Sequence, residues 1–95
     1  MSNELMAMRD RIHAKLAAAF VPASLEVADE SDQHAGHAGS RAGGQTHFRV
    51  HIVSGAFEGK SRIERHRLIN ASLADELAGG VHALAIHASA PGETG

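Results

Sequence analysis

The order of hydrophobic and polar positions along the chain predicts five secondary-structure elements. Apolar residues recur at three- and four-residue spacing from Leu5 to Phe20, as on one face of a helix, and Pro22 ends this pattern. Apolar and polar residues alternate over 24–29 and again over 46–53, as they do in half-buried strands. A second helical pattern begins at Ser61, and a third strand pattern covers 81–88. The predicted order is helix, strand, strand, helix, strand.

The second helix carries the clearest boundary signals. Ser61 and Glu64 fit the S-x-x-E capping box, and Gly79 and Gly80 provide a stop. His66 falls in the middle of the apolar stripe of this helix, so we interpret it as a structural histidine that is hydrogen-bonded within the core. The predicted stripe consists of Ile63, Ile69, Leu73 and Leu77.

This order of elements predicts an α+β domain in which both helices pack on one face of a three-stranded mixed sheet. The second and third strands are joined through a helix, which favours a right-handed crossover and parallel pairing. In that case the segment entering the second strand and the start of the third strand, with His82, lie at the same end of the sheet. We expect one domain over 1–95, with a flexible loop at about 31–45 and a disordered tail at about 91–95.

Composition narrows the range of functions. The 95 residues include no cysteine, 3% aromatic residues and eight histidines, with a formal charge of −2. The chain therefore has no thiol nucleophile and no disulfide, and its charge argues against a strongly basic nucleic-acid binder. No signal-peptide pattern or membrane-spanning apolar run is present, which predicts a cytoplasmic protein without membrane association. No nucleophile–base pair or carboxylate pair stands out, so we expect no enzymatic activity.

Two histidines lie in a loop that is rich in glycine and alanine, "DQHAGHAGSRAGGQTH". His34 and His37 could turn toward a third group there without steric cost. Together with His82, the loop supplies half of a four-coordinate metal site, which suits a centre shared with a partner. Two alternatives remain open at this point: a solvated loop that happens to carry imidazoles, and a zinc or copper site that needs no partner.

A basic segment, "KSRIERHR", forms the start of the second helix. It could contact the phosphates of a nucleic acid or an acidic partner, or it could be a solvated helix face. The preceding "GAFEGKS" is not a phosphate-binding loop, because only three residues separate its glycines and Glu58 would repel a phosphate. The candidate contact residues are Lys60, Arg62, Arg65 and Arg67.

From about Leu25 to Pro91 the chain resembles the BolA family. The specific parts of the match are "THFRVHIVS", "FEGKS…RHRLI" and "VHALAI". The resemblance implies a fold like the type II KH domain, with helices on a three-stranded sheet whose last two strands run parallel. That fold agrees with the order of elements inferred from periodicity.

The resemblance also implies a role in iron–sulfur cluster handling and iron regulation. BolA-like proteins pair with monothiol glutaredoxins, and the heterodimer holds a [2Fe–2S] cluster through the glutaredoxin's cysteine, a glutathione and ligands from the BolA-like chain. The resemblance implies that these ligands are the histidine of "VHAL", His82, and one loop histidine, His34 or His37. Alone, the chain would hold no cluster.

The family also includes DNA-binding transcription regulators, and the matching part of this chain is the turn and basic helix "FEGKSRIERHR". This gives an alternative function in which Lys60–Arg67 contacts DNA weakly. The G-x-x-G signature of KH domains is absent from that turn, because Gly55 and Gly59 are separated by three residues. KH-style gripping of a single strand is therefore not expected.

Overall fold

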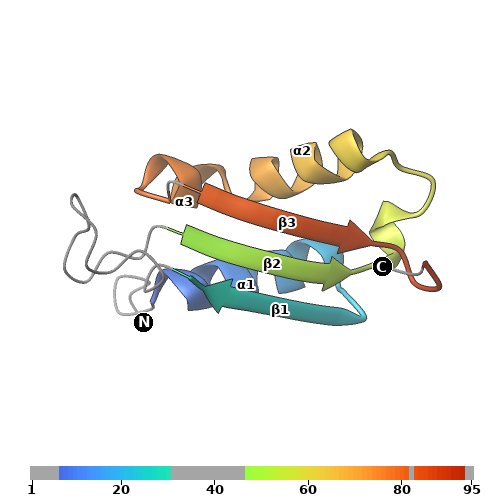
Figure 1. Cartoon of the computed structure of the whole chain (residues 1–95), viewed down its shortest axis with the longest axis horizontal. Coiled ribbons are helices and arrows are strands. Elements are labelled where there is room, and N and C mark those ends of the chain that lie inside the picture. The colour runs from blue at the N-terminus through green and yellow to red at the C-terminus, as the bar shows by residue number, and fades with distance from the viewer. Residues whose placement is uncertain (1–6, 31–46, 82, 94–95) are drawn as a thin grey trace.

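The computed structural model describes residues 7–30, 47–81 and 83–93, and it has the predicted order of elements (Figure 1). The one addition is a single 3-10 turn after the second strand, and the second helix is divided in two. The elements are α1 (Met8–Phe20), β1 (Ser24–Asp29), β2 (His47–Val53), η3 (Gly55–Phe57), α2 (Arg62–Ser72), α3 (Ala74–Ala78) and β3 (Ala83–Ser89).

The three strands form one mixed sheet in the order β1-β2-β3. β1 pairs with β2 antiparallel and β2 pairs with β3 parallel, so the predicted crossover through a helix is confirmed. Val50 lies at the centre of the sheet, opposite Val27 on one side and Ile86 on the other. The predicted α+β class with a mixed sheet is therefore correct.

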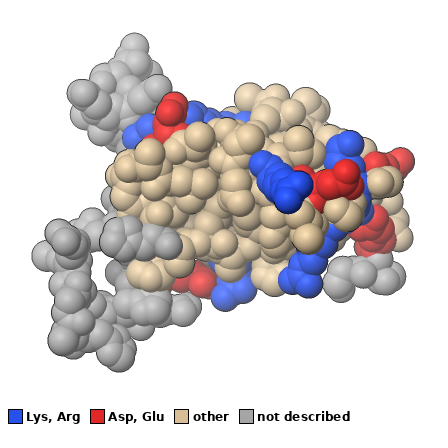
Figure 2. Space-filling view, turned by 90° about the horizontal axis from the view of Figure 1, so that it is seen from above, with Lys and Arg blue, Asp and Glu red and all other residues tan. Residues whose placement is uncertain are grey.

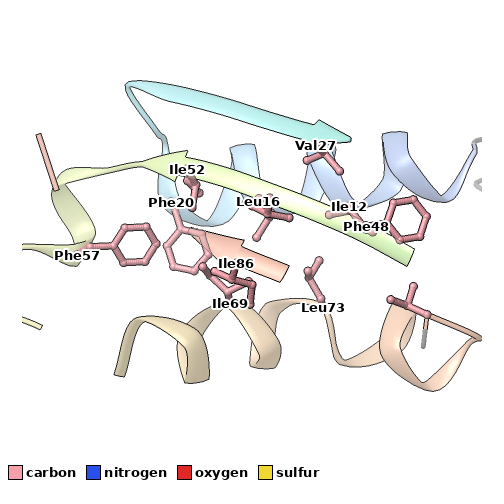
Figure 3. Close-up of a cluster of buried hydrophobic side chains, with 12 residues drawn as sticks. Ile12, Leu16, Phe20, Val27, Phe48, Ile52, Phe57, Ile69, Leu73 and Ile86 are labelled. Carbon is pink, nitrogen blue, oxygen red and sulfur yellow. The ribbon is translucent and has the colours of Figure 1, made fainter. Parts of the chain in front are cut away.

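The core lies between one face of this sheet and the helices (Figure 3). Alternate strand residues point into it, and α1 contributes one side chain per turn, because residues three and four apart share a helix face. The opposite face of the sheet carries the exposed His51 and His87. The buried side chains include Ile12, Leu16, Phe20, Val27, Phe48, Val50, Ile52, Phe57, Ile69, Leu73 and Ile86.

The second helical segment begins as predicted but is divided into two helices. α2 begins at the predicted capping box, in which the Ser61 hydroxyl accepts from the Glu64 N–H at 3.1 Å and the Glu64 carboxylate accepts from the Ser61 N–H at 2.7 Å. The helix then breaks at Leu73 and resumes as α3. Just before the break the Ser72 hydroxyl donates to the Leu68 carbonyl, a side-chain bond of the kind that bends helices.

The predicted apolar stripe is wrong at its first position, because the Ile63 side chain is 64% exposed. Phe57 and Phe20 fill that end of the core instead, with ring centroids 5.0 Å apart (Figure 3). His66, one turn further along α2, is half-buried and lies outside the buried core, so the predicted core position for this histidine is also wrong.

Residues 91–93 belong to the segment predicted as a disordered tail at about 91–95, and residues 94–95 of that segment lie outside the described residues. Residues 91–93 form a turn in which the Glu93 N–H donates to the Ala90 carbonyl at 3.1 Å, and the Glu93 carboxylate pairs with Arg65. The predicted flexible loop at about 31–45 falls outside the described residues. Among the helices that are described, none has the length and apolar character needed to cross a membrane.

Candidate functional site

The three predicted metal ligands, His34, His37 and His82, lie outside the described residues. The described chain nevertheless fixes where the segments that carry them begin and end. The Glu30 N–H donates to the His47 carbonyl at 2.8 Å, so the loop leaves β1 and enters β2 at one end of the sheet. Ala83, the neighbour of His82, pairs with His47 at that same end.

The chain is fixed on both sides of His82. Val81 is buried in the core, and its N–H donates to the Glu76 carbonyl at 3.3 Å. Ala83 is the first residue of β3. Within 7–30, 47–81 and 83–93, no group of three or more His, Asp or Glu residues is arranged to hold a metal. The described residues by themselves therefore form no three-ligand metal site.

The helix segment before His82 is held by a buried carboxylate. Glu76 of α3 is buried, and its two oxygens pair with Arg11 Nη2 at 3.1 Å and Lys15 Nζ at 3.0 Å, both from α1. The contact with Glu76 raises the pKa of Lys15 above its usual range. α3, which precedes Val81, is therefore tied to α1 by charge.

A second cluster lies at the opposite end of the parallel pair β2–β3. A cavity of about 720 Å³ opens between these strands, the start of α2 and the C-terminal turn. We refer to it as the histidine–arginine cavity. Figure 2 looks down on α2 and shows several Lys and Arg side chains toward the end of the molecule at which this helix begins. The charged or titratable side chains that line the cavity are His51, His66, His87, Lys60, Arg62, Arg65 and Glu93.

The four basic residues predicted to form one contact surface differ in their surroundings. Lys60, Arg62 and Arg65 line the cavity, whereas Arg67 does not. Arg65 is only 12% exposed, and its guanidinium binds both oxygens of Glu93 at 2.8 Å. It also donates to the carbonyls of Lys60 and Ala88. Arg65 therefore has a structural role, because it joins α2 to β3 and to the C-terminal turn. The sequence did not reveal this role.

The Arg65–Glu93 pair predicts a specific acid dependence of stability. The guanidinium, helped by the Ala90 N–H, lowers the pKa of Glu93 from 4.5 to about 2. A carboxyl group with a depressed pKa stabilises the fold fully above pH 4.5 and loses this contribution as the pH falls toward 2. We therefore expect Glu93→Gln to lower the urea midpoint at pH 6 and to have almost no effect near pH 2.

The matched control for this prediction is Glu58→Gln, a change in the exposed turn before α2. Because Glu93 is 44% exposed, water and salt weaken the pair and the effect at pH 6 should be modest. Equal midpoints for the wild-type chain and Glu93→Gln at pH 6 would contradict the stabilising role of the pair.

His51 and His87 form a stacked pair on the open face of the sheet. They are register partners on β2 and β3, with ring centroids 4.4 Å apart and an angle of 13° between the planes. Arg49 Nη1 lies 3.1 Å from His87 Nε2, and Arg49 Nε donates to Glu30 at 2.9 Å. A guanidinium only donates, so this contact favours the neutral form of His87 that accepts at Nε2.

The surroundings of His87 oppose its protonation. Desolvation lowers the pKa of His87 below 6.5, and electrostatic repulsion from His51, Arg49, Arg62 and His66 lowers it further. The sequence did not single out His87. Alternation along β3 places it opposite Leu84 and Ile86, but its neighbour His51 follows only from the parallel register.

The fold defines a class: a small α+β domain whose helices cover one face of a three-stranded mixed sheet. Within that class, residues 16–93 match the profile of the BolA-like protein family, and the chain belongs to this family. The solved structure of BolA1 from Arabidopsis thaliana superimposes with a TM-score of 0.84 and 42% identity, covering 96% of this chain and 99% of that one.

Two curated relatives carry different names. BolA-like protein 1 of Pongo abelii is 54% identical over 84 residues, which cover 88% of this chain and 58% of that protein. The DNA-binding transcriptional regulator BolA of Escherichia coli is 50% identical over 82 residues, which cover 86% of this chain and 74% of the relative. This chain thus spans little more than half of the first relative.

Proposed function

We propose that this chain is a non-enzymatic adaptor that binds a monothiol glutaredoxin and co-ligates a [2Fe–2S] cluster with it. The observation that carries the proposal is that the chain segments flanking the candidate ligands meet at one end of the sheet. Glu30, His47 and Ala83, which flank the segments carrying the three candidate ligands, are neighbours there. Membership of the BolA-like family supports the same assignment.

The donor chemistry of the chain fits a shared cluster. The chain has no cysteine, so it can offer imidazole but no thiolate. Imidazole in place of thiolate on iron is known from Rieske-type centres, where it raises the reduction potential. In this proposal His82 is one ligand and His34 or His37 is the other, while the partner's cysteine and a glutathione complete the set.

The test is cluster reconstitution with a monothiol glutaredoxin and glutathione, followed by visible absorption and circular dichroism. We expect His82→Ala to abolish the heterodimer spectrum, and we expect only one of His34→Ala and His37→Ala to do the same. His13→Ala, a change on α1 away from this end of the sheet, is the matched control. An unchanged spectrum for His82→Ala would remove the ligand assignment.

A second candidate function is DNA binding by the start of α2. It is favoured by the cationic lining of the histidine–arginine cavity and by the name of the E. coli relative. Arg62 and Arg67 would be the informative residues, because Arg65 is bound to Glu93 and its removal would disturb the fold. Retardation of a duplex that both Arg62→Gln and Arg67→Gln weaken, with a shallower salt dependence, would support this candidate.

A further inference from the structure

We propose that the histidine–arginine cavity is a binding site for a small dianion of the phosphate-monoester class, and that binding is coupled to proton uptake by its histidines. This site lies at the carboxyl ends of β2 and β3, whereas the proposed cluster ligands belong to the opposite end of the sheet. The inference does not rest on the adaptor function.

The size and charge of the cavity indicate the class of ligand. A volume of about 720 Å³ lies within the range of small-molecule sites. The lining carries three permanent cations and one carboxylate, a net charge of +2, in a chain whose formal charge is −2. Glu93 already neutralises Arg65, so Lys60 and Arg62 supply the charge that is left for a ligand. A dianion matches that charge, whereas a phosphodiester brings only one negative charge.

The position of the cavity in the fold supports an anion for a separate reason. Ligands of sheets with parallel strands commonly bind beyond the carboxyl ends of those strands, where the following helix begins. Here that helix is α2, eleven residues long, whose N-terminus carries a partial positive charge. The Glu64 carboxylate of the capping box offsets part of this charge, so the positive potential of the cavity comes mainly from its side chains.

The histidines make binding depend on pH. An anion in the cavity lowers the positive potential that now opposes protonation of His87, so the pKa of His87 is higher in the bound state than in the free state. Protons are then taken up on binding, and affinity rises as the pH falls. The other charged or titratable groups near His87, from every neighbouring element, are Glu26, Glu30, Arg49, His51, Lys60, Arg62, Arg65, His66 and Glu93.

The carboxylates near His87 do not cancel the positive potential around this residue. Arg49 is paired with Glu30 and Arg65 with Glu93, so each of these carboxylates is already matched by a cation. Glu26 of β1 is the register partner of His51, on the side of that ring away from β3. The net surroundings of His87 remain positive, in agreement with the lowered pKa of this residue.

Sulfate is the probe for the coupling, because it stays a dianion from pH 5.5 to 7.5 and its own titration cannot imitate that of the protein. The dissociation constant is measured by NMR titration of the full chain at constant ionic strength, without glutaredoxin or iron. We expect about tenfold tighter binding at pH 5.5 than at pH 7.5, below the limit of about a hundredfold that uptake of one full proton over two pH units would give. Equal affinity at the two pH values would overturn the coupling.

Two matched pairs of variants locate the site. Arg62→Gln should weaken sulfate binding at least about fivefold, the loss of one charge-assisted contact. Arg67→Gln, on the same helix but outside the cavity, should leave it unchanged. His87→Gln should flatten the pH dependence, whereas His13→Gln should not. If Arg62→Gln and Arg67→Gln weaken sulfate binding equally, sulfate responds to the general surface charge rather than to the cavity, and the proposed site is wrong.

The ligand class is tested by comparing glycerol 2-phosphate with a short DNA duplex at pH 6.5. Tighter binding of the monoester than of sulfate, with the same dependence on Arg62, supports the proposal. Duplex binding that depends equally on Arg62 and Arg67, without monoester binding, overturns it in favour of DNA contact. Because these titrations contain no cluster, their outcome is separate from that of the adaptor proposal.

Discussion

Replacing Phe57 with alanine is expected to lower the free energy of unfolding by about 3–5 kcal/mol, the usual cost of truncating a buried phenylalanine. Phe57 is fully buried, and its ring lies against that of Phe20 at a tilt of 37° (Figure 3). Ser54, which begins the same turn, donates to the Phe20 carbonyl at 2.7 Å and accepts from the Ala56 N–H at 3.1 Å. The turn is therefore fastened to α1 by one ring and one hydroxyl.

The loss is measured by urea denaturation followed by circular dichroism. It would remove a large part of the 5–14 kcal/mol typical of a 95-residue domain. Phe57→Leu is the control, with an expected loss of about 1 kcal/mol, since it keeps most of the apolar volume. A loss below about 1.5 kcal/mol for Phe57→Ala would show that the neighbouring side chains close the cavity. Because the Lys60 N–H donates to the Phe57 carbonyl at 3.2 Å, the same variant should also disturb one wall of the histidine–arginine cavity.

The fold was predictable because each element carries its own local signal. The α1 stripe of Ile12, Leu16 and Phe20 and the alternation of β2 are both present in the structure as predicted. The prediction from periodicity was wrong in the first turn of α2. The spacing shows that Ile63 lies on the apolar side of the helix, but it does not show whether the core extends to that turn. Phe57, which follows no helical or strand pattern, fills that space instead.

The candidate sites were less predictable because they depend on pairings between distant residues. A basic run such as Lys60–Arg67 predicts a single contact surface. In the structure, however, Arg65 is bound to Glu93, 28 positions along the chain. His87 gains its significance from His51 and Arg49, which lie on another strand. Residue types indicate which side chains are cations and imidazoles, but the sheet register decides which of them lie together.

The second large expected effect on the free energy of unfolding concerns the ion pairs of Glu76. The loss of stability depends on whether the carboxylate or the two cations are removed. The Glu76 side chain is fully buried, whereas the side chains of Arg11 and Lys15 are 33% and 37% exposed. Replacing both cations with methionine leaves a buried carboxylate without a partner, for which about 3–5 kcal/mol is expected. Glu76→Met should cost less, because Arg11 and Lys15 can turn toward water.

The variant with methionine at all three positions completes a mutant cycle, in which it is compared with Glu76→Met and with the variant lacking both cations. Because an apolar group replaces the desolvated charge, its stability should recover most of the loss seen when only the two cations are replaced. Arg9→Met, at an exposed position on the same helix, is the control and should be nearly neutral. If the triple variant is as unstable as the variant lacking both cations, packing at α1 rather than the buried charge carries the effect. If it recovers, the unpaired buried charge is what destabilises the variant lacking both cations, and apolar packing holds α3 against α1 without the ion pairs.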